Sequence, residues 1–173
     1  MIIDRDRSLL LVVDLQTKMV PAIHDRDQLV ANVVWLIRAA QKIGVPFCPE
    51  SKLSGIGLGN TERLKNVWYR RTFEVPAAMK GKRVRIHFGG VYYRAWVYIN
   101  GQLAGTHIGE NVAFNFEITR LLKDGQNEVV VKVLDDMWSG LQPCGKQCFD
   151  KSWSCFYTRT TGIWQSVWLE AVG

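Results

Sequence analysis

The chain of 173 residues is long enough for one full domain, or for one domain and a fragment of another. Its apolar content of 47% is ordinary for a globular protein, and no apolar run reaches the roughly 18 residues that a membrane-spanning helix needs. The net charge of +6 comes from dispersed cations without a basic run or a nucleic-acid-binding motif, so we expect neither nucleic acid nor membrane as a partner.

The N-terminal segment and the cysteines indicate a cytoplasmic protein. Residues 8–15 are too short for a signal peptide's apolar core and cleavage site, and Asp14 interrupts them. The last three cysteines have C-x3-C-x6-C spacing, which does not match the paired knuckles of structural zinc. We therefore expect no metal, no cofactor and four free thiols in a reducing compartment: Cys48, Cys144, Cys148 and Cys155.

Residues 1–44 have the pattern of a β-α unit. Residues 9–13 form a continuous aliphatic run, which is typical of a strand covered on both faces. Residues 27–43 have helical periodicity, and Gly44 follows at a position suited to a helix C′ residue. A doubly wound domain would repeat this unit several times, and the sequence does not.

From Trp68 onward the apolar period is two. Asn100-Gly101 is the dipeptide best suited to a two-residue type I′ turn, and it predicts a hairpin with aromatic and aliphatic side chains on opposite faces. Further alternating segments lie at 84–88, 114–118, 129–133 and 167–171. Short strands separated by turn residues predict a mainly β fold, an antiparallel sandwich. The segment from 135 to 162 is too long for a passive connector.

Five stretches resemble the N-terminal sugar-binding domain of glycoside hydrolase family 2, the β-galactosidase and β-glucuronidase group. They are VPFCPESKLSGIG at 45–57, VWYRRTFEVP at 67–76, the hairpin that begins at Arg94, FNFEITRLLKDGQNEVVVKV at 114–133, and TRTTGIWQSVWLE at 158–170. The resemblance implies a jelly-roll-like β-sandwich over residues 45–173, whose loops help to wall a sugar site. In that family a β/α barrel carries two catalytic glutamates, and we expect neither the barrel nor glycosidase activity here.

Residues 1–44 resemble instead the start of an isochorismatase-like cysteine hydrolase, through LLLVVDLQ at 9–16, Pro21-Ala22-Ile23 and the helix before Gly44. That resemblance implies a role for Asp14 beside a lysine and a nucleophilic cysteine further along the chain. Nothing after residue 44 resembles their contexts, and nucleophile, base and orienter must lie within hydrogen-bond reach of one another. We therefore expect no catalytic residues and interpret the chain as a chimera.

The 135–165 region holds the side chains of a sugar site: aromatic faces for the C–H side of a pyranose, and polar or charged groups for its hydroxyls. The candidates are Asp136, Trp138, Lys146, Gln147, Trp153, Tyr157 and Arg159. Packing or simple exposure explains each one better when it is taken singly, but the resemblance places the loop as a whole at the sugar. We expect weak binding of a β-galactoside or β-glucuronide. The alternatives are a folding unit without evolved activity and a remnant of an isochorismatase-like hydrolase.

Each of the two parts of the sequence lacks strands that its fold would normally pair with. The sandwich lacks the opening strands that the family has upstream of Val45, and the aliphatic strand at 9–13 has no parallel sheet to cover it. We expect this strand to pair with the exposed sandwich edge of its own chain. Homodimerisation through that edge is the rival outcome.

Overall fold

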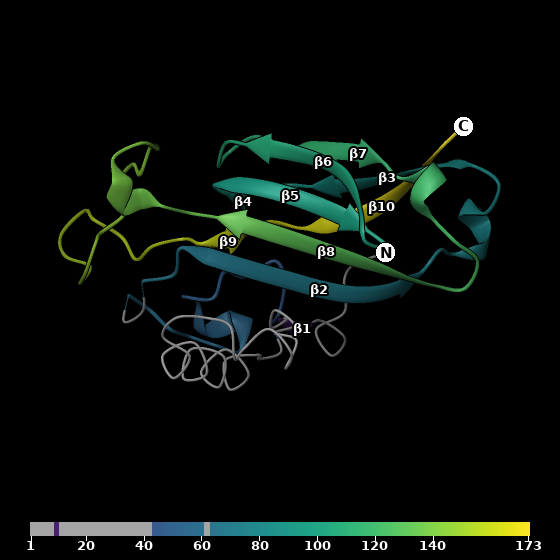
Figure 1. Cartoon of the computed structure of the whole chain (residues 1–173). Coiled ribbons are helices and arrows are strands. Elements are labelled where there is room, and N and C mark those ends of the chain that lie inside the picture. Colours follow the sequence, from purple (N-terminus) through teal and green to yellow (C-terminus); the bar gives the residue numbers. More distant parts are fainter. Residues whose placement is uncertain (1–8, 11–42, 61–62) are drawn as a thin grey trace, which may run out of the picture.

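The computed structural model describes residues 9–10, 43–60 and 63–173, and it shows two main antiparallel sheets packed as a sandwich (Figure 1). The five-stranded sheet has the order β1-β2-β8-β5-β6, the three-stranded sheet β10-β3-β7, and β4 pairs with β9. The strands are β1 (Leu9–Leu10), β2 (Asn66–Glu74), β3 (Arg83–Phe88), β4 (Val91–Tyr92), β5 (Arg94–Ile99), β6 (Gln102–Ile108), β7 (Phe114–Glu117), β8 (Gln126–Leu134), β9 (Gly162–Ile163) and β10 (Val167–Val172).

Helical structure in the described ranges is confined to short 3-10 turns in the connections. They are η3 (Lys52–Ser54), η4 (Ala77–Met79), η5 (Thr119–Leu121) and η6 (Met137–Ser139). No helix in this part of the chain has the length and apolar character to cross a membrane. The expected mainly β, antiparallel fold is confirmed. The β-α unit expected before it lies almost wholly outside the described residues.

The core forms where the inner faces of the two sheets meet. Its buried side chains follow the predicted period of two: Val84, Ile86 and Phe88 in β3, Val97 and Ile99 in β5, and Val131 and Val133 in β8. Burying such an aliphatic or aromatic side chain contributes about 1.5–3 kcal/mol, so the inward faces of these strands stabilise the sandwich substantially.

The hairpin between β5 and β6 turns at Asn100 and Gly101, as predicted. Both residues have positive φ, 50° and 81°, which a type I′ turn requires. The Asn100 side chain also accepts the backbone N–H of Glu128 at 3.0 Å and donates to Asn127 Oδ1 at 2.8 Å. The turn is therefore tied to β8, the central strand beside it.

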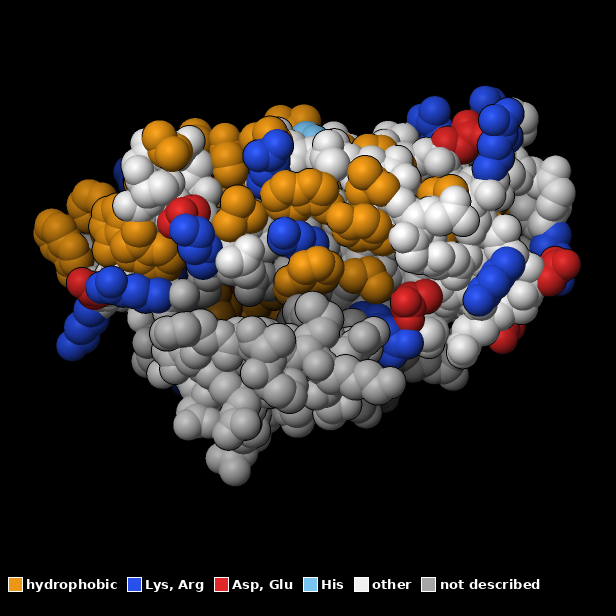
Figure 2. Space-filling model, in the orientation of Figure 1, with side chains coloured by type: hydrophobic (Ala, Val, Ile, Leu, Met, Phe, Trp, Pro, Cys, Tyr) orange, Lys and Arg blue, Asp and Glu red, His pale blue; other side chains and the backbone are white. Residues whose placement is uncertain are grey.

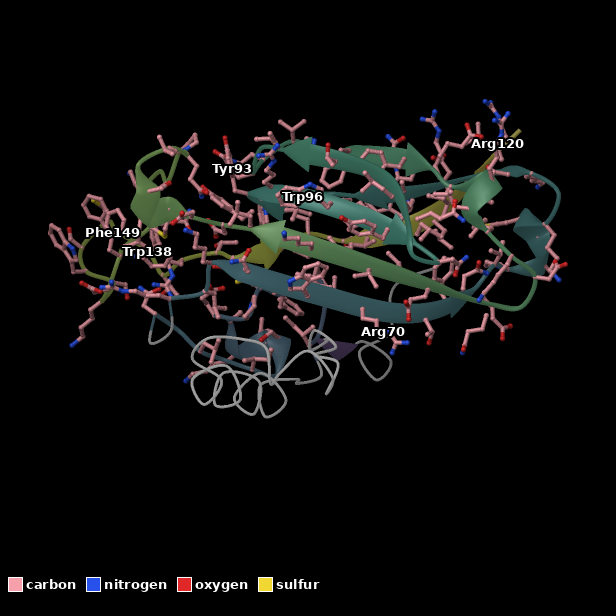
Figure 3. The ribbon with its side chains drawn as sticks, viewed as in Figure 1. Arg70, Tyr93, Trp96, Arg120, Trp138 and Phe149 are labelled. Atoms are coloured by element: carbon pink, nitrogen blue, oxygen red, sulfur yellow. The ribbon has the colours of Figure 1, made fainter. Side chains whose placement is uncertain are left out.

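Aromatic and cationic side chains alternate on the outer face of the five-stranded sheet. Lys132 in β8 lies opposite both Trp68 in β2 and Trp96 in β5, and its Nζ is 5.5 Å and 5.0 Å from the two ring centroids. Figure 3 shows Trp96 on this face. The cation covers both rings, and such contacts contribute about 0.5–1 kcal/mol at exposed sites. Trp164 directly follows the short strand β9.

Strand β1, which consists of residues 9–10, pairs with the edge of β2. Leu9 pairs with Arg70 and Leu10 with Tyr69 in antiparallel register, which is the intramolecular pairing expected for the start of the 9–13 strand. Residues 11–13 and most of the predicted 27–43 helix lie outside the described residues. Ile43 is 1% exposed and belongs to the sandwich core, although the predicted boundary placed it in the N-terminal part. The division at residue 44 stays a prediction.

Candidate functional site

The candidate site is the loop of residues 135–161, which leaves the sandwich after β8 and returns at β9. It lies at one end of the sandwich, at the left of Figure 1. Backbone hydrogen bonds give the loop a fixed shape: Cys148 N–H donates to Tyr157 O at 2.8 Å, and Tyr157 N–H donates to Lys146 O at 2.9 Å. All seven predicted sugar-contacting residues therefore lie on one ordered element.

Arg159 organises the inside of this loop. It is 2% exposed, its guanidinium carbon lies 4.8 Å from the centroid of the Trp138 ring, and Nη1 donates to the backbone O of Phe149 at 3.1 Å. The Phe149 ring is tilted against Trp138 at 6.4 Å between centroids, and Figure 3 shows both at the loop end of the sandwich. In this structure Arg159 and Trp138 thus face each other, and Arg159 does not reach the surface.

Two further predicted residues are engaged by neighbouring groups. The Asp136 carboxylate forms an ion pair with Lys65, with 2.5 Å between Oδ2 and Nζ. Gln147 Oε1 accepts the backbone N–H of Thr160 at 2.7 Å. Both side chains connect parts of the loop or its base, so a sugar would have to share them with these partners.

Lys146, Trp153 and Tyr157 are the predicted residues that reach the surface. Trp153 is 65% exposed and Tyr157 63% exposed, and the Trp153 ring stacks on Phe156 with 5.1 Å between centroids. Figure 2 shows hydrophobic side chains gathered at this end of the molecule. The loop therefore presents aromatic surface and an amino group to solvent, on a base fixed by the other four predicted residues.

A buried polar cluster at the base of the loop was missed by the sequence analysis. It contains Glu50, Asp135 and Thr161, which are 4%, 2% and 1% exposed, together with Arg159. Thr161 N–H donates to Glu50 Oε2 at 3.2 Å, and Gln142 Nε2 donates to Asp135 Oδ1 at 2.6 Å. The alternation that buries every second side chain at the C-terminal end of β8 continues to Asp135, so this pattern could have predicted that Asp135 is buried. No local pattern indicates Glu50.

Burial raises the pKa of both carboxyl groups in this cluster. The pKa of Asp135 rises to about 6 because the group is desolvated, an effect that the hydrogen bond from the Gln142 side chain and the Arg159 charge oppose. Burial likewise raises the pKa of Glu50, and the hydrogen bond from the Thr161 backbone N–H and the charge of Arg159 oppose this rise. These are structural acids inside the domain, and neither lies on the exposed aromatic face of the loop.

The thiols and other potential metal ligands form no centre among the described residues. All four cysteines are free, and no group of three or more His, Cys, Asp or Glu side chains in the described ranges is arranged to hold a metal ion. Burial raises the pKa of the Cys48 thiol to about 11, with the Glu50 charge adding to the effect. A thiol with so high a pKa is mostly protonated at neutral pH and is a poor nucleophile.

The domain is an antiparallel β-sandwich with an aromatic, partly polar loop at one end. The family model described as glycosyl hydrolases family 2, sugar binding domain, matches residues 59–172. The chain therefore belongs to this family. The resemblance to this family is confirmed, and four of its five stretches, those from residue 67 onward, lie within the match.

The related proteins are much longer than this chain. It is 38% identical over 105 residues to a β-galactosidase of Thermoanaerobacter pseudethanolicus, covering 60% of this chain and 13% of that protein. It is 34% identical over 113 residues to a β-glucuronidase of Formosa agariphila, covering 61% and 11%. The chain thus spans about an eighth of the length of the curated relatives it matches.

A solved structure shares the fold. The crystal structure of a Bacteroides uniformis β-glucuronidase superposes with a TM-score of 0.61 at 22% identity, covering 95% of this chain and 17% of that one. At this identity the match supports the fold alone. The isochorismatase-like resemblance of residues 1–44, and with it the chimera, finds no support in these matches and stays a prediction.

Proposed function

We propose that this chain is a non-catalytic carbohydrate-binding domain that supplies the 135–161 loop to the sugar site of a β-galactosidase- or β-glucuronidase-type protein. The observation that carries the proposal is the exposure of Trp153 and Tyr157 beside Lys146 on a loop whose shape is fixed from within. An aromatic ring at the surface suits the apolar C–H face of a pyranose. The Lys146 ammonium suits a sugar hydroxyl or the carboxylate of a uronic acid.

The loop by itself forms an open surface, so its affinity for a free sugar is low. Small polar ligands need most of their surface enclosed, and an open face leaves much of the sugar in water. We expect a dissociation constant on the order of millimolar. Catalysis needs two carboxyl groups placed across the sugar, roughly 5–10 Å apart. Glu50 and Asp135 are buried beneath the loop and do not meet this need.

Isothermal titration with methyl β-galactoside and methyl β-glucuronide tests the proposal. Trp153→Ala and Tyr157→Ala should each weaken binding several-fold, because each removes an exposed ring from the loop. Trp168→Ala, which removes a partly exposed ring from the three-stranded sheet, is the matched control and should bind like the wild type. Lys146→Met should weaken glucuronide binding more than galactoside binding.

Two outcomes would contradict the proposal. Absence of binding at tens of millimolar sugar would favour the alternative of a chimeric folding unit without evolved activity, or of an isochorismatase-like remnant. Turnover of nitrophenyl-β-galactoside or nitrophenyl-β-glucuronide that co-purifies with the protein would show that the domain is not purely a binding unit. A cytoplasmic location and a homodimer through the strand edge remain predictions alongside this proposal.

A further inference from the structure

Both ends of the site loop are anchored in the same buried cluster. The loop begins at Asp135, directly after β8, and ends at Thr161, directly before β9. Glu50 comes from a distant part of the sequence, 111 residues from Thr161, and accepts the Thr161 N–H. Glu50 Oε1 and Thr161 Oγ1 are buried in the same cluster without a hydrogen-bond partner among the described residues, and the Asp135 N–H donates to the Lys65 carbonyl oxygen at 2.9 Å. The cluster therefore forms the neck through which the loop is held to the sandwich.

The neck contains two carboxyl groups and one guanidinium. The Arg159 charge acts on both Glu50 and Asp135, and each of these carboxyl groups is desolvated. Among the described residues Cys48, Tyr69 and Tyr92 also interact with one or both acids, and none of these three side chains carries positive charge. With both acids ionised the cluster has a net negative charge in a buried place. One bound proton makes it neutral.

We propose that Glu50 and Asp135 are positioning residues for the site loop. A proton held by this pair shifts the equilibrium between a closed neck, in which the two acids are buried as in this structure, and an open neck, in which they are exposed to water. When the pair holds one proton, its remaining charge is matched by Arg159 and the neck is closed. When both acids are ionised, burying the second charge is unfavourable and the neck opens more often. The consequence for sugar binding rests on the proposed function; the opening of the neck does not.

The direction of the pH dependence follows from linkage. An acid whose pKa is higher in the closed state binds more protons when closed, so closure is favoured at low pH and weakens as pH rises. Asp135 moves from an ordinary value of 3.8 to about 6, so its contribution disappears as pH rises through about 6. From Asp135 alone, the equilibrium constant for closure should fall about tenfold between pH 5 and pH 7.5.

Hydrogen exchange of the intact chain without sugar tests this inference. Peptides from residues 135–161 should lose about tenfold in protection between pH 5 and pH 7.5, after correction for the intrinsic exchange rate, whereas β3 peptides should not. Asp135→Asn and Glu50→Gln mimic the protonated acids and keep oxygen acceptors for Gln142 and Thr161, so each should reduce the slope. Asp150→Asn removes an exposed carboxylate of the same loop and should keep it.

If protection of residues 135–161 in the wild type did not change between pH 5 and pH 7.5, the inference would be overturned even if the variants failed to fold. So would a wild-type slope that persists unchanged in both Asp135→Asn and Glu50→Gln. Because no sugar is present, this result is independent of the titration above. Failure to bind sugar with a pH-dependent neck would reject only the proposed function, and sugar binding with a flat profile would reject only the neck.

Discussion

The hydroxyl oxygen of Tyr69 occupies the space that a side chain at Gly162 would need. A Cβ atom at Gly162 would lie 2.0 Å from this oxygen, which also accepts the backbone N–H of Ile163 at 3.1 Å. Gly162 has a φ of 76°, in the left-handed region that disfavours residues with a Cβ. Strand β2 and the end of the site loop are therefore locked together at this contact.

Gly162→Ala should lower the free energy of unfolding by about 2–4 kcal/mol, from the backbone strain and the overlap with Tyr69 combined. Urea denaturation measures the loss. Gly101→Ala is the matched control, because its φ of 81° is similar while no heavy atom lies within 4 Å of the added Cβ. It should lose only about 1–2 kcal/mol. Equal losses in the two variants would contradict a steric role for Tyr69.

Asn127→Asp should be strongly destabilising at neutral pH. Asn127 is 1% exposed, and its Nδ2 donates to the carbonyl oxygens of Lys123 and Gly125, each at 3.0 Å. A carboxylate cannot donate to them, so we expect a loss of at least about 2 kcal/mol that shrinks as acid protonates the new group. Denaturation at two pH values checks this. The exposed Asn115→Asp should change stability by less than about 0.5 kcal/mol.

Replacing the predicted site residues Trp138 and Trp153 with alanine should change the free energy of unfolding by different amounts. Trp138→Ala removes the ring that packs against Arg159, and we expect it to cost about 2–4 kcal/mol and to loosen the loop. Trp153→Ala should change the free energy of unfolding by less than about 0.5 kcal/mol, because the ring is 65% exposed. Chemical denaturation and near-ultraviolet circular dichroism distinguish them. A large loss in Trp153→Ala would show that the ring supports the loop rather than serving a ligand.

The cysteines should differ in reactivity. Burial holds the pKa of Cys48 at about 11, so its thiolate is scarce at pH 8, whereas Cys155 is exposed. Iodoacetamide at pH 8 should therefore alkylate Cys155 well before Cys48, as peptide mapping would show. The two rates should converge in urea. Equal rates in the folded protein would mean that Cys48 is accessible and its thiolate is stabilised.

The pairing of Leu9 and Leu10 with β2 should protect their backbone amides in a monomer. The two residues lie in antiparallel register with Arg70 and Tyr69, so exchange at this edge should be slower than in an unpaired segment. Hydrogen exchange checks this, with light scattering to establish the oligomeric state. Protection that appears only at high protein concentration would favour dimerisation through the edge. Fast exchange at all concentrations would contradict the pairing.

Much of the fold could be read from the sequence, because the determinants are local. Alternation along one strand fixes which side chains face the core, so Val84, Ile86 and Phe88 were predictable without any knowledge of their partners. The Asn100-Gly101 turn follows from the φ angles that these two residues tolerate. The length of the segment after β8 indicated more than a passive connector, but only the family resemblance placed it at a sugar, and that placement stays a prediction.

Only the tertiary structure decided which loop residues face solvent and which hold the loop together. Arg159 and Trp153 are both plausible sugar contacts by residue type, yet one is 2% exposed and the other 65%. The difference depends on groups far away in sequence: Glu50 meets Thr161 across 111 residues, and Tyr69 meets Ile163 across 94. Side-chain chemistry and local period carry no information about such contacts, because burial is set by which distant segments the closed sandwich brings together.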